Sequence, residues 1–349
     1  MATIKDIAEL AGVSPTTVSN VIHNKKGKIS TAKLELIKHY IDELNYIPNV
    51  GAMILAGQNT KIIGVITDYS RKYSTEVLED PFMSAILAAI ENEIRCRGYY
   101  TMLHVAQGEQ EVVSLAETWK VSGLLIMGLE SEECIEILEK ARVPIVFIDC
   151  YLKDTLKVQS KKIVNQYYNI GLEDKQGGYI ITKYLISLGH KNILFIGDQF
   201  ENDTVNRLRQ EGYIKALKEA GLGIPKCDKM YMYQNQEKRE LTLNHMYEYW
   251  KQNIFTAIFF CSDYYAFQAS RYFLEKNVHI PRDLSIVGFD DNKFAQFAYP
   301  SLTTIHQDVK ARGEAAVDML DSIIKGEKII DPIVRFPVKV IERESTRKI

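Results

Sequence analysis

Residues 12–30 read GVSPTTVSNVIHNKKGKIS, and this stretch decides how the N-terminal part of the chain folds. Ser14 followed by Pro15 is typical of a helix start, because a serine side chain caps the first turn and a proline there loses no hydrogen bond. Val18 and Ile22 then recur at helical spacing and give the helix one apolar face. The stretch therefore predicts a short helix that packs against neighbours by that face.

Two further short helices are predicted on either side of this one. Thr3 with Asp6 three residues later is typical of a capping box, and Gly12 is typical of the end of a helix. After the lysine cluster, Ser30 is expected to cap a third helix, whose inward face comprises Leu34, Ile37, Ile41 and Leu44. Two short helices joined by a tight glycine-containing turn predict a helix-turn-helix head over residues 1–45.

The outer face of the middle helix carries Pro15, Thr16, Ser19 and Asn20, which are small or polar. Such a face suits insertion into the major groove of DNA. The alternative is a solvated helix in a small bundle that binds protein. The net charge of the whole chain is only −2 and no arginine precedes Arg71, so any nucleic-acid surface has to be local.

Composition places the chain among globular proteins. Its 349 residues are 46% hydrophobic and 25% charged, which is ordinary for a protein of two or three domains. The five cysteines have neither metal-ligand nor redox-motif spacing, so we expect free buried thiols, no metal and no cofactor. A signal peptide and a long apolar run are both missing from the sequence, which predicts a cytoplasmic protein without a membrane span.

Residues 46–60, YIPNVGAMILAGQNT, are predicted to be a linker with an unusual interior. Pro48 stops the preceding helix, Asn49 is suited to cap a new one, and Gly57 to end it. A helix shorter than ten residues is marginal on its own in water, so we expect it to need a partner.

From residue 61 the pattern changes to apolar strand-like runs that alternate with helical stretches. A first series contains strands at 62–67, 100–105, 123–128 and 144–149, and a second at 192–197, 229–233, 257–260 and 284–290. Alternation of this kind predicts parallel sheets with helices on both faces. We therefore expect two doubly wound lobes with a cleft between them within residues 61–349. The first would hold about 61–160 plus 292–322, and the second about 161–291 plus 323–349.

Motifs along nearly the whole chain resemble the lactose-repressor (LacI/GalR) family of bacterial transcription regulators. They are TIKDIA (3–8), AGVS (11–14), TVS (17–19), NYIPN (45–49), DPF (80–82), FID (147–149), LEDKQGG (172–178), LGHKNILFIG (188–197), RQEGYIKALKEAG (209–221), SIVGFDD (285–291) and PSLTTI (300–305). The resemblance implies a core like the type I periplasmic binding proteins. It also implies a homodimer on a pseudo-palindromic DNA operator, controlled by a small-molecule effector in the interlobe cleft.

From the head and linker we expect a set of DNA-contacting residues. They are Thr3, Ser14, Pro15, Thr16, Thr17, Ser19, Asn20, Asn24, Lys25, Lys28, Asn49, Ala52 and Leu55. The resemblance implies that Leu55 wedges into the minor groove from a hinge helix formed on DNA. Met53 departs from the arginine usual in the family. Asn20 also replaces a usual arginine, and because asparagine pairs bidentately with adenine, we predict an A·T pair at that operator position.

In the cleft, Arg209 is suited to hold vicinal hydroxyls or a carboxylate, and the matching arginine contacts effector in many family members. The alternative is a surface ion pair. Asp149, Asp290, Ser262 and Asp263 follow the carboxyl ends of predicted strands, where open α/β sheets bind ligands. For Asp290 and Asp263 the alternative is a helix cap, and Ser262 departs from the asparagine often found in the family.

Three aromatic residues complete the expected effector site. Phe82 matches a position that stacks on ligand in the family, although it could equally anchor a helix start in the core. Tyr69 belongs to a loop, DYSRKYSTEVLED (68–80), that is longer than in relatives and that we expect to cover the cleft mouth. Tyr233, at a strand end, is a further candidate.

We therefore expect a repressor with a carbohydrate effector, since hydroxyl-rich ligands suit Arg209, Asp149 and Asp290. A nucleobase or phosphosugar effector, and an activator or co-repressor-dependent regulator, are the alternatives. An enzyme is disfavoured because His190 has no nucleophile at motif spacing, and neither Gly-Gly at 177–178 nor GFDD resembles a phosphate-binding loop. A sugar-binding protein of the periplasmic type is disfavoured by the helix-turn-helix.

Overall fold

The computed structural model describes residues 2–22, 29–46, 51, 60–67, 77–153, 166–198, 204–227, 229–233 and 235–349. The chain forms two compact units, Met1–Thr60 and Lys61–Ile349. The smaller unit is the helical head, and the larger is the α/β core.

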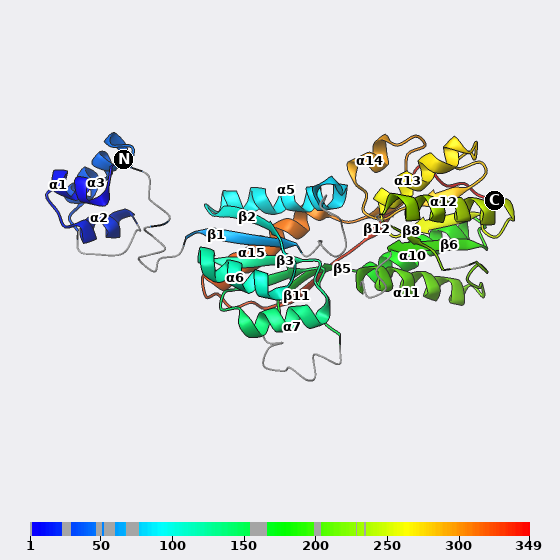
Figure 1. Cartoon of the computed structure of the whole chain (residues 1–349), viewed down its shortest axis with the longest axis horizontal. Coiled ribbons are helices and arrows are strands. Elements are labelled where there is room, and N and C mark those ends of the chain that lie inside the picture. Colours follow the sequence, from blue (N-terminus) through cyan, green and yellow to red (C-terminus); the bar gives the residue numbers. More distant parts are fainter. Residues whose placement is uncertain are drawn as a thin grey trace. The chain divides into compact units, whose positions relative to one another are not determined.

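The head consists of α1 (Ile4–Leu10), α2 (Pro15–Ile22) and α3 (Thr31–Glu43), as Figure 1 shows. The predicted capping box is confirmed, because the Thr3 hydroxyl accepts from the Asp6 amide at 3.3 Å and the Asp6 carboxylate accepts from the Thr3 amide at 2.7 Å. Ser14 caps α2 by accepting from the Thr17 amide at 3.1 Å. Gly12 has a φ of +60°, a left-handed conformation that glycine adopts without strain.

The centre of the head is a small apolar core of Ile7, Ala8, Ala11, Val18 and Ile37. Because α2 turns its valines inward, its small polar residues stay outside. The expectation for Ser30 is wrong in one respect. Ser30 does precede α3, but its side chain makes no capping hydrogen bond.

The first lobe of the core is built on a six-stranded parallel sheet in the order β11-β5-β4-β3-β1-β2. Its strands are β1 (Ile62–Thr67), β2 (Tyr100–Val105), β3 (Gly123–Met127), β4 (Ile145–Ile148), β5 (Asn169–Leu172) and β11 (Ile333–Phe336). Helices α5 (Pro81–Cys96) and α15 (Val309–Ile324) cover one face, and α6 (Glu109–Trp119) and α7 (Ser131–Lys140) cover the other. A short 3-10 helix, η1 (Val77–Glu79), precedes α5.

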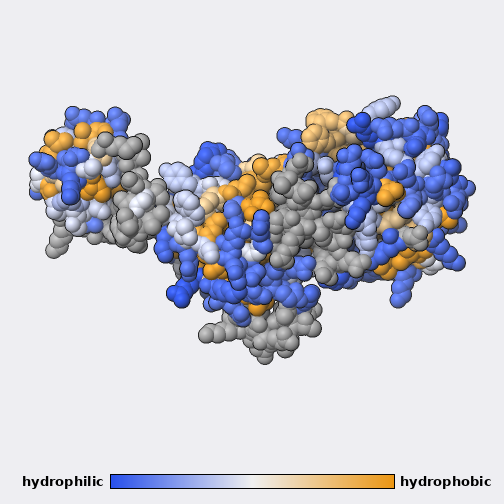
Figure 2. Space-filling model, viewed as in Figure 1, coloured by the Kyte–Doolittle hydropathy of each residue, from blue (hydrophilic) through white to orange (hydrophobic). Residues whose placement is uncertain are grey.

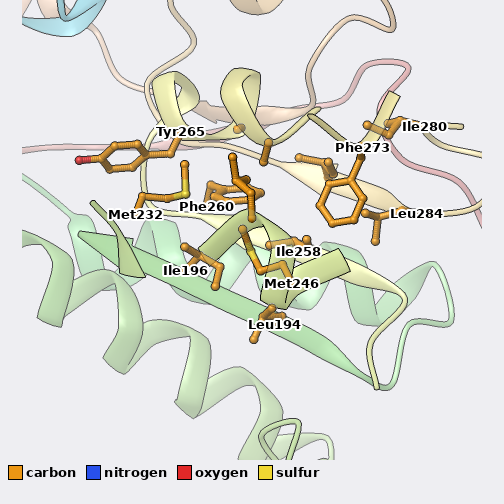
Figure 3. Close-up of a cluster of buried hydrophobic side chains, with 14 of the residues drawn as sticks. Leu194, Ile196, Met232, Met246, Ile258, Phe260, Tyr265, Phe273, Ile280 and Leu284 are labelled. Carbon is orange, nitrogen blue, oxygen red and sulfur yellow. The ribbon is translucent and has the colours of Figure 1, made fainter. Parts of the chain in front are cut away.

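The second lobe has a parallel sheet in the order β7-β6-β8-β9, beside an antiparallel pair β10-β12. Its strands are β6 (Ile193–Asp198), β7 (Tyr231–Met232), β8 (Ala257–Phe260), β9 (Ser285–Val287), β10 (Thr304–His306) and β12 (Lys339–Ile341). Its helices are α10 (Asp174–Ser187), α11 (Thr204–Glu219), α12 (Gln236–Lys251), α13 (Asp263–Glu275) and α14 (Lys293–Phe297). Figure 3 shows the buried apolar cluster by which α12 and α13 cover one face of this sheet, with Phe260 near its centre.

The predicted fold class is confirmed, but the expected lobe boundaries are wrong. Strands β5 and β11 join the first sheet, and β10 lies beside β9 through bridges at Thr303 and His306. The described chain therefore passes between the lobes at three places: after β5, after β10 and after β11. An alternating sequence pattern predicts that strands exist, but it carries no information on which sheet each one joins.

The cysteines also differ from the expectation of buried thiols. All five are free, but Cys96 is exposed and Cys227 is half-buried.

Helices α10 and α11 approach each other unusually closely at two glycines. A Cβ added to Gly178 would lie 2.0 Å from the Arg209 carbonyl oxygen, and one added to Gly212 would lie 2.0 Å from the Lys175 carbonyl oxygen. Only a residue without a Cβ permits this distance. The contact fixes the height at which α11 presents Arg209.

We predict that Gly178→Ala lowers the free energy of unfolding by about 2 kcal/mol or more, because the new methyl group forces two backbones apart. The better helix propensity of alanine offsets about 1 kcal/mol of the cost. Gly223→Ala is the matched control, because a Cβ there meets nothing within 4 Å. Equal midpoints of urea unfolding for the two variants would contradict the close contact.

Candidate functional site

The head exposes the surface that the sequence predicts for DNA contact. Pro15 and Thr16 are exposed, and Ser19 and Asn20 are partly exposed on the same side of α2. The hydroxyls of Ser14 and Thr17 lie 2.9 Å apart. The Thr3 hydroxyl also donates to Asp6 at 2.9 Å, so its oxygen is engaged in the capping box.

Several expected DNA contacts fall outside the described residues. They are Asn24, Lys25, Lys28, Asn49, Ala52 and Leu55. Contact with DNA remains a prediction for all the residues named above.

A cavity of about 90 Å³ lies between the two lobes of the core. The first lobe lines it with the start of α5 and the carboxyl ends of β3 and β4. The second lobe lines it with the carboxyl ends of β6 and β8, with Asp290 beyond the end of β9, and with the first turns of α11 and α13. The lining residues are Asp80, Phe82, Met127, Gly128, Leu129, Glu130, Ile148, Asp149, Asp198, Thr204, Val205, Asn206, Arg209, Cys261, Ser262, Tyr265 and Asp290.

Five of the expected effector residues therefore meet in one cavity: Phe82, Asp149, Arg209, Ser262 and Asp290. Ser262 also has a structural role, because its side chain caps α13 by accepting a hydrogen bond from the Tyr264 amide at 3.1 Å. Tyr69 lies outside the described residues.

Asp263 and Tyr233 are not among the described residues that line the cavity. Asp263 is completely buried in the second lobe, where it accepts from the Thr304 hydroxyl at 2.6 Å and the Asn292 amide at 3.1 Å. Burial raises the pKa of its carboxyl to about 7. Through these two hydrogen bonds Asp263 holds β10 and the segment before α14 in place.

Tyr233 lies after β7, where its ring contacts that of Tyr231.

Arg209 is buried and held on three sides. Its Nε donates to Asp174 at 2.8 Å, its Nη1 donates to the Cys261 carbonyl oxygen at 2.5 Å, and its guanidinium carbon lies 3.6 Å from the centre of the Phe289 ring. Asp174 is itself buried and accepts from the Tyr151 hydroxyl at 2.7 Å. The guanidinium therefore reaches the cavity in one fixed orientation.

A second set of contacts begins at Asp149. Its carboxylate accepts from Arg312, which also donates to the side-chain oxygen of Gln307. The Gln307 amide donates to Asp290 at 2.7 Å. Since the Tyr151 hydroxyl lies 3.2 Å from Asp149, the two sets are joined.

This polar chain, from Arg209 through Asp174, Tyr151, Asp149, Arg312 and Gln307 to Asp290, runs through the base of the cavity. Its members come from both lobes and from two of the three segments that join them. The chain therefore connects the two lobes by hydrogen bonds.

Asp149 and Asp290 have unusual backbones. Their φ values are +56° and +134°, in the left-handed half of conformational space that side chains other than glycine rarely adopt. Both follow a buried strand that ends at the cavity. Non-glycine residues held in this way cluster at ligand sites, where the surrounding structure has to over-determine them.

Sequence reasoning missed several residues of this region. Among them are Asp80, Tyr151, Asp174, Asp198, Tyr265, Gln307 and Arg312. Asp174 and Asp80 lie inside motifs that carry the resemblance but received no predicted role. Asp198 directly follows the predicted strand 192–197, and position at a strand end was the signal that identified Asp149 and Asp290. The helix containing Arg312 was not predicted at all.

We predict that Arg312→Met lowers the free energy of unfolding by about 3–5 kcal/mol, because it leaves the buried Gln307 side-chain oxygen without its donor and the Asp149 carboxylate without its cation. Arg95→Met is the matched control, because the Arg95 side chain is 65% exposed and its ion pair is with Glu91, one turn away on α5. Chemical denaturation of both variants checks the difference. A small effect of Arg312→Met would show that water replaces the guanidinium at low cost.

No helix among the described residues is long and apolar enough to cross a membrane. The same residues contain no group of His, Cys, Asp and Glu side chains placed to hold a metal ion.

Comparison with known proteins matches both units of the chain. Residues 3–49 match the model of bacterial regulatory proteins of the lacI family, and residues 182–346 match that of the periplasmic binding protein-like domain. The HTH-type transcriptional repressor PurR of Pasteurella multocida is 32% identical over 355 residues, 99% of each chain. The repressor of the same name from Haemophilus influenzae is 34% identical over 327 residues, covering 92% of this chain and 90% of the relative.

Among solved structures, the Lac repressor dimer bound to operator and the anti-inducer ONPF aligns with a TM-score of 0.80. It is 27% identical and covers 99% of both chains. The relatives are thus transcriptional repressors over their full length. The chain belongs to the lacI family of bacterial regulatory proteins, with a helix-turn-helix head that binds DNA and a periplasmic-binding-protein-like core.

Proposed function

We propose that this protein is a transcriptional repressor that binds a pseudo-palindromic operator as a homodimer. A small molecule either releases the protein from the operator or increases its affinity for it. The observation that carries the proposal is the pairing of an exposed small polar face on α2 with a cavity between two linked lobes. Full-length relatives that are named repressors support the same reading.

A second copy of the chain has a surface to dock on. Phe294, Phe297 and Tyr299 are exposed by 58%, 77% and 91%, and an orange patch covers α14 in Figure 2. A groove of about 450 Å³, lined by Phe267, Leu274, Pro300 and other residues, lies beside Tyr299. Exposed apolar patches of this kind mark interaction sites. We assign the patch to a homodimer because the matching Lac repressor structure is a dimer on operator.

For DNA reading, we predict that Asn20→Ala weakens binding to the selected operator by about tenfold or more but hardly changes binding to random DNA, because a bidentate base contact is lost. His39→Ala, on the exposed side of α3, is the matched control. Fluorescence anisotropy at one fixed salt concentration measures the affinity of both variants.

An operator with two half-sites should bind two chains in sedimentation experiments, and a single half-site should bind far more weakly.

Two results would contradict this assignment. One is a selected operator that retains guanine at the position facing residue 20 and is undisturbed by Asn20→Ala. The other is equal affinity for one half-site and two.

The size of the cavity limits the effector. On the scale where one water needs roughly 10–15 Å³, a volume of about 90 Å³ holds six to nine waters. That space suits a molecule of one ring. We therefore propose a monosaccharide-sized effector with several hydroxyl groups, held by Arg209 and the surrounding carboxylates. A nucleobase has the same size and is the second candidate.

The polar chain beneath the cavity offers a path from effector to DNA. An effector that contacts Arg209 and Asp149 touches both lobes at once, so it favours one interlobe arrangement over another. Coupling then follows from the difference in effector affinity between two dimer states.

We predict that Arg209→Lys removes the thermal stabilisation by effector while changing operator affinity little. Lysine keeps a charge for Asp174 but cannot reproduce the planar fork. Arg207→Lys, two residues earlier on α11, is the matched control, because Arg207 pairs with Glu211 at the surface. The assay is a thermal-shift screen of sugars and nucleobases, in which bound ligand raises the melting temperature. Undiminished effector affinity in Arg209→Lys would refute the role of Arg209.

A further inference from the structure

We propose that Gln307 is a positioning residue that holds Asp149 and Asp290, which line the effector cavity from opposite lobes, in a fixed relation to each other. This inference rests on the proposed effector cavity and goes further by naming a residue that controls it from outside the described lining. It follows from the hydrogen bonds at the two ends of one side-chain amide.

Gln307 lies where the chain passes from the second lobe to the first. Strand β10 ends one residue before it, at His306, and helix α15 begins two residues after it, at Val309. Strand β10 pairs with β12 in the second lobe, whereas α15 packs on the first sheet. Gln307 is only 2% exposed, so its amide depends on hydrogen-bond partners inside the protein.

The two ends of the Gln307 side chain are bonded to different lobes. Its Nε2 donates to the Asp290 carboxylate at 2.7 Å, and its Oε1 accepts from Nη1 of Arg312 on α15. Arg312 also donates through Nη2 to Asp149, which directly follows β4. Three consecutive hydrogen bonds therefore run from Asp290 in the second lobe to Asp149 in the first.

The orientation of the Gln307 amide is set by the chemistry of its neighbours. A guanidinium can only donate, so the amide oxygen has to face Arg312, and the NH2 group is left to donate to Asp290. Glutamine suits this position because its side chain ends in one acceptor and one donor group. A glutamate would repel the Asp290 carboxylate, a lysine would repel Arg312, and a methionine would make neither contact.

The backbones at both carboxylates are held in conformations that need support. Asp149 and Asp290 have φ values of +56° and +134°, which residues other than glycine rarely adopt. The Asp149 amide donates to the Ile170 carbonyl oxygen at 3.0 Å, and the Asp290 amide donates to the Ile305 carbonyl oxygen at 2.9 Å. If Gln307 holds the two side chains, then loss of its contacts should let both of these backbone hydrogen bonds open more often.

Hydrogen exchange of the full chain, followed by mass spectrometry, measures that opening. Gln307→Met keeps the approximate size of the side chain but makes neither hydrogen bond. We expect exchange at Asp149 and at Asp290 to become about fivefold faster or more, which is the effect of losing one net hydrogen bond. Faster exchange at Asp290 alone would overturn the inference, because the effect of Gln307 would then stop inside the second lobe.

Gln236→Met is the matched control. Gln236 is exposed at the start of α12 and donates to Glu240 on the same helix at 3.0 Å. The substitution makes the same chemical change away from the passage between the lobes. Exchange at both carboxylate positions should therefore remain that of the unmodified chain.

Charged groups act on both ends of the contact. Burial raises the pKa of Asp290 well above its usual range, Asp263 and Asp80 raise it further, and Arg209 lowers it. Position 307 faces the guanidinium of Arg312. A carboxyl introduced at position 307 therefore keeps its cation but gains a like charge beside it.

Gln307→Glu uses this charge to separate polarity from size. A glutamate has the size of glutamine but donates only when it is protonated. A like charge raises the pKa of the pair of carboxyls, so at low pH the pair shares a proton and the bond to Asp290 forms. Exchange should then equal that of the unmodified chain at the same pH. As the pH rises the proton is lost, and exchange at Asp149 and Asp290 should become about fivefold faster or more.

A double variant restores the contact with its polarity reversed. When Gln307→Glu is combined with Asp290→Asn, the carboxylate at position 307 accepts from the new amide and still accepts from Arg312. Exchange at Asp149 should return to the rate of the unmodified chain at every pH. Fast exchange that persists in the double variant would contradict a role that depends on donor and acceptor placement.

These measurements need neither DNA nor a known effector, so they fail independently of the proposed function. If Gln307→Glu exchanges like the unmodified chain at every pH, Gln307 only fills space, and the inference is overturned while the effector cavity stands. If no sugar or nucleobase stabilises the protein, the proposed effector falls, and hydrogen exchange still decides whether Gln307 links the two lobes.

Discussion

The buried ion pair between Arg209 and Asp174 is the contact on which the organisation of the core depends. Removing two charges from water is costly, so such a pair persists only where other hydrogen bonds satisfy both partners. Here Tyr151 completes Asp174 from the first lobe, and the Cys261 carbonyl and the Phe289 ring complete Arg209 within the second. Gly178 allows the backbone of Arg209 to approach closely enough for all of these contacts to form together.

This arrangement places a rigid cation in the wall of the cavity, which Asp149 and Asp290 also line. The pair holds the guanidinium in one orientation. The polar chain that continues through Asp149 and Arg312 ties that orientation to the segments between the lobes. These buried charges connect the two lobes by hydrogen bonds. Apolar packing of the two sheets supplies stability through the four hydrophobic clusters of the core.

The sequence was sufficient for the head and for the general architecture of the core. Thr3, Asp6, Gly12 and Ser14 act locally, so capping rules found them without knowledge of the fold. Alternating strands and helices predicted two parallel sheets, but β5 was missed because NIGL is only four residues long. Asp149, Ser262 and Asp290 were found because each follows a predicted strand, whereas Arg209 and Phe82 were found through the family resemblance. Arg312 and Gln307 could not be found in this way, because their role depends on a segment that returns to the first lobe late in the chain.

The three segments that connect the lobes also limit where the gene of this protein can be recombined with that of a relative. Neither lobe is a continuous stretch of sequence, since β5, α15 and β11 are separated by most of the second lobe. A single exchange of gene segments within the core would therefore mix strands of one sheet from two parents. The junction near residue 60, where one compact unit ends and the next begins, offers a clean joint. New regulators with the same sensor can thus arise by replacing the head, whereas new sensors have to arise by substitution inside an intact core.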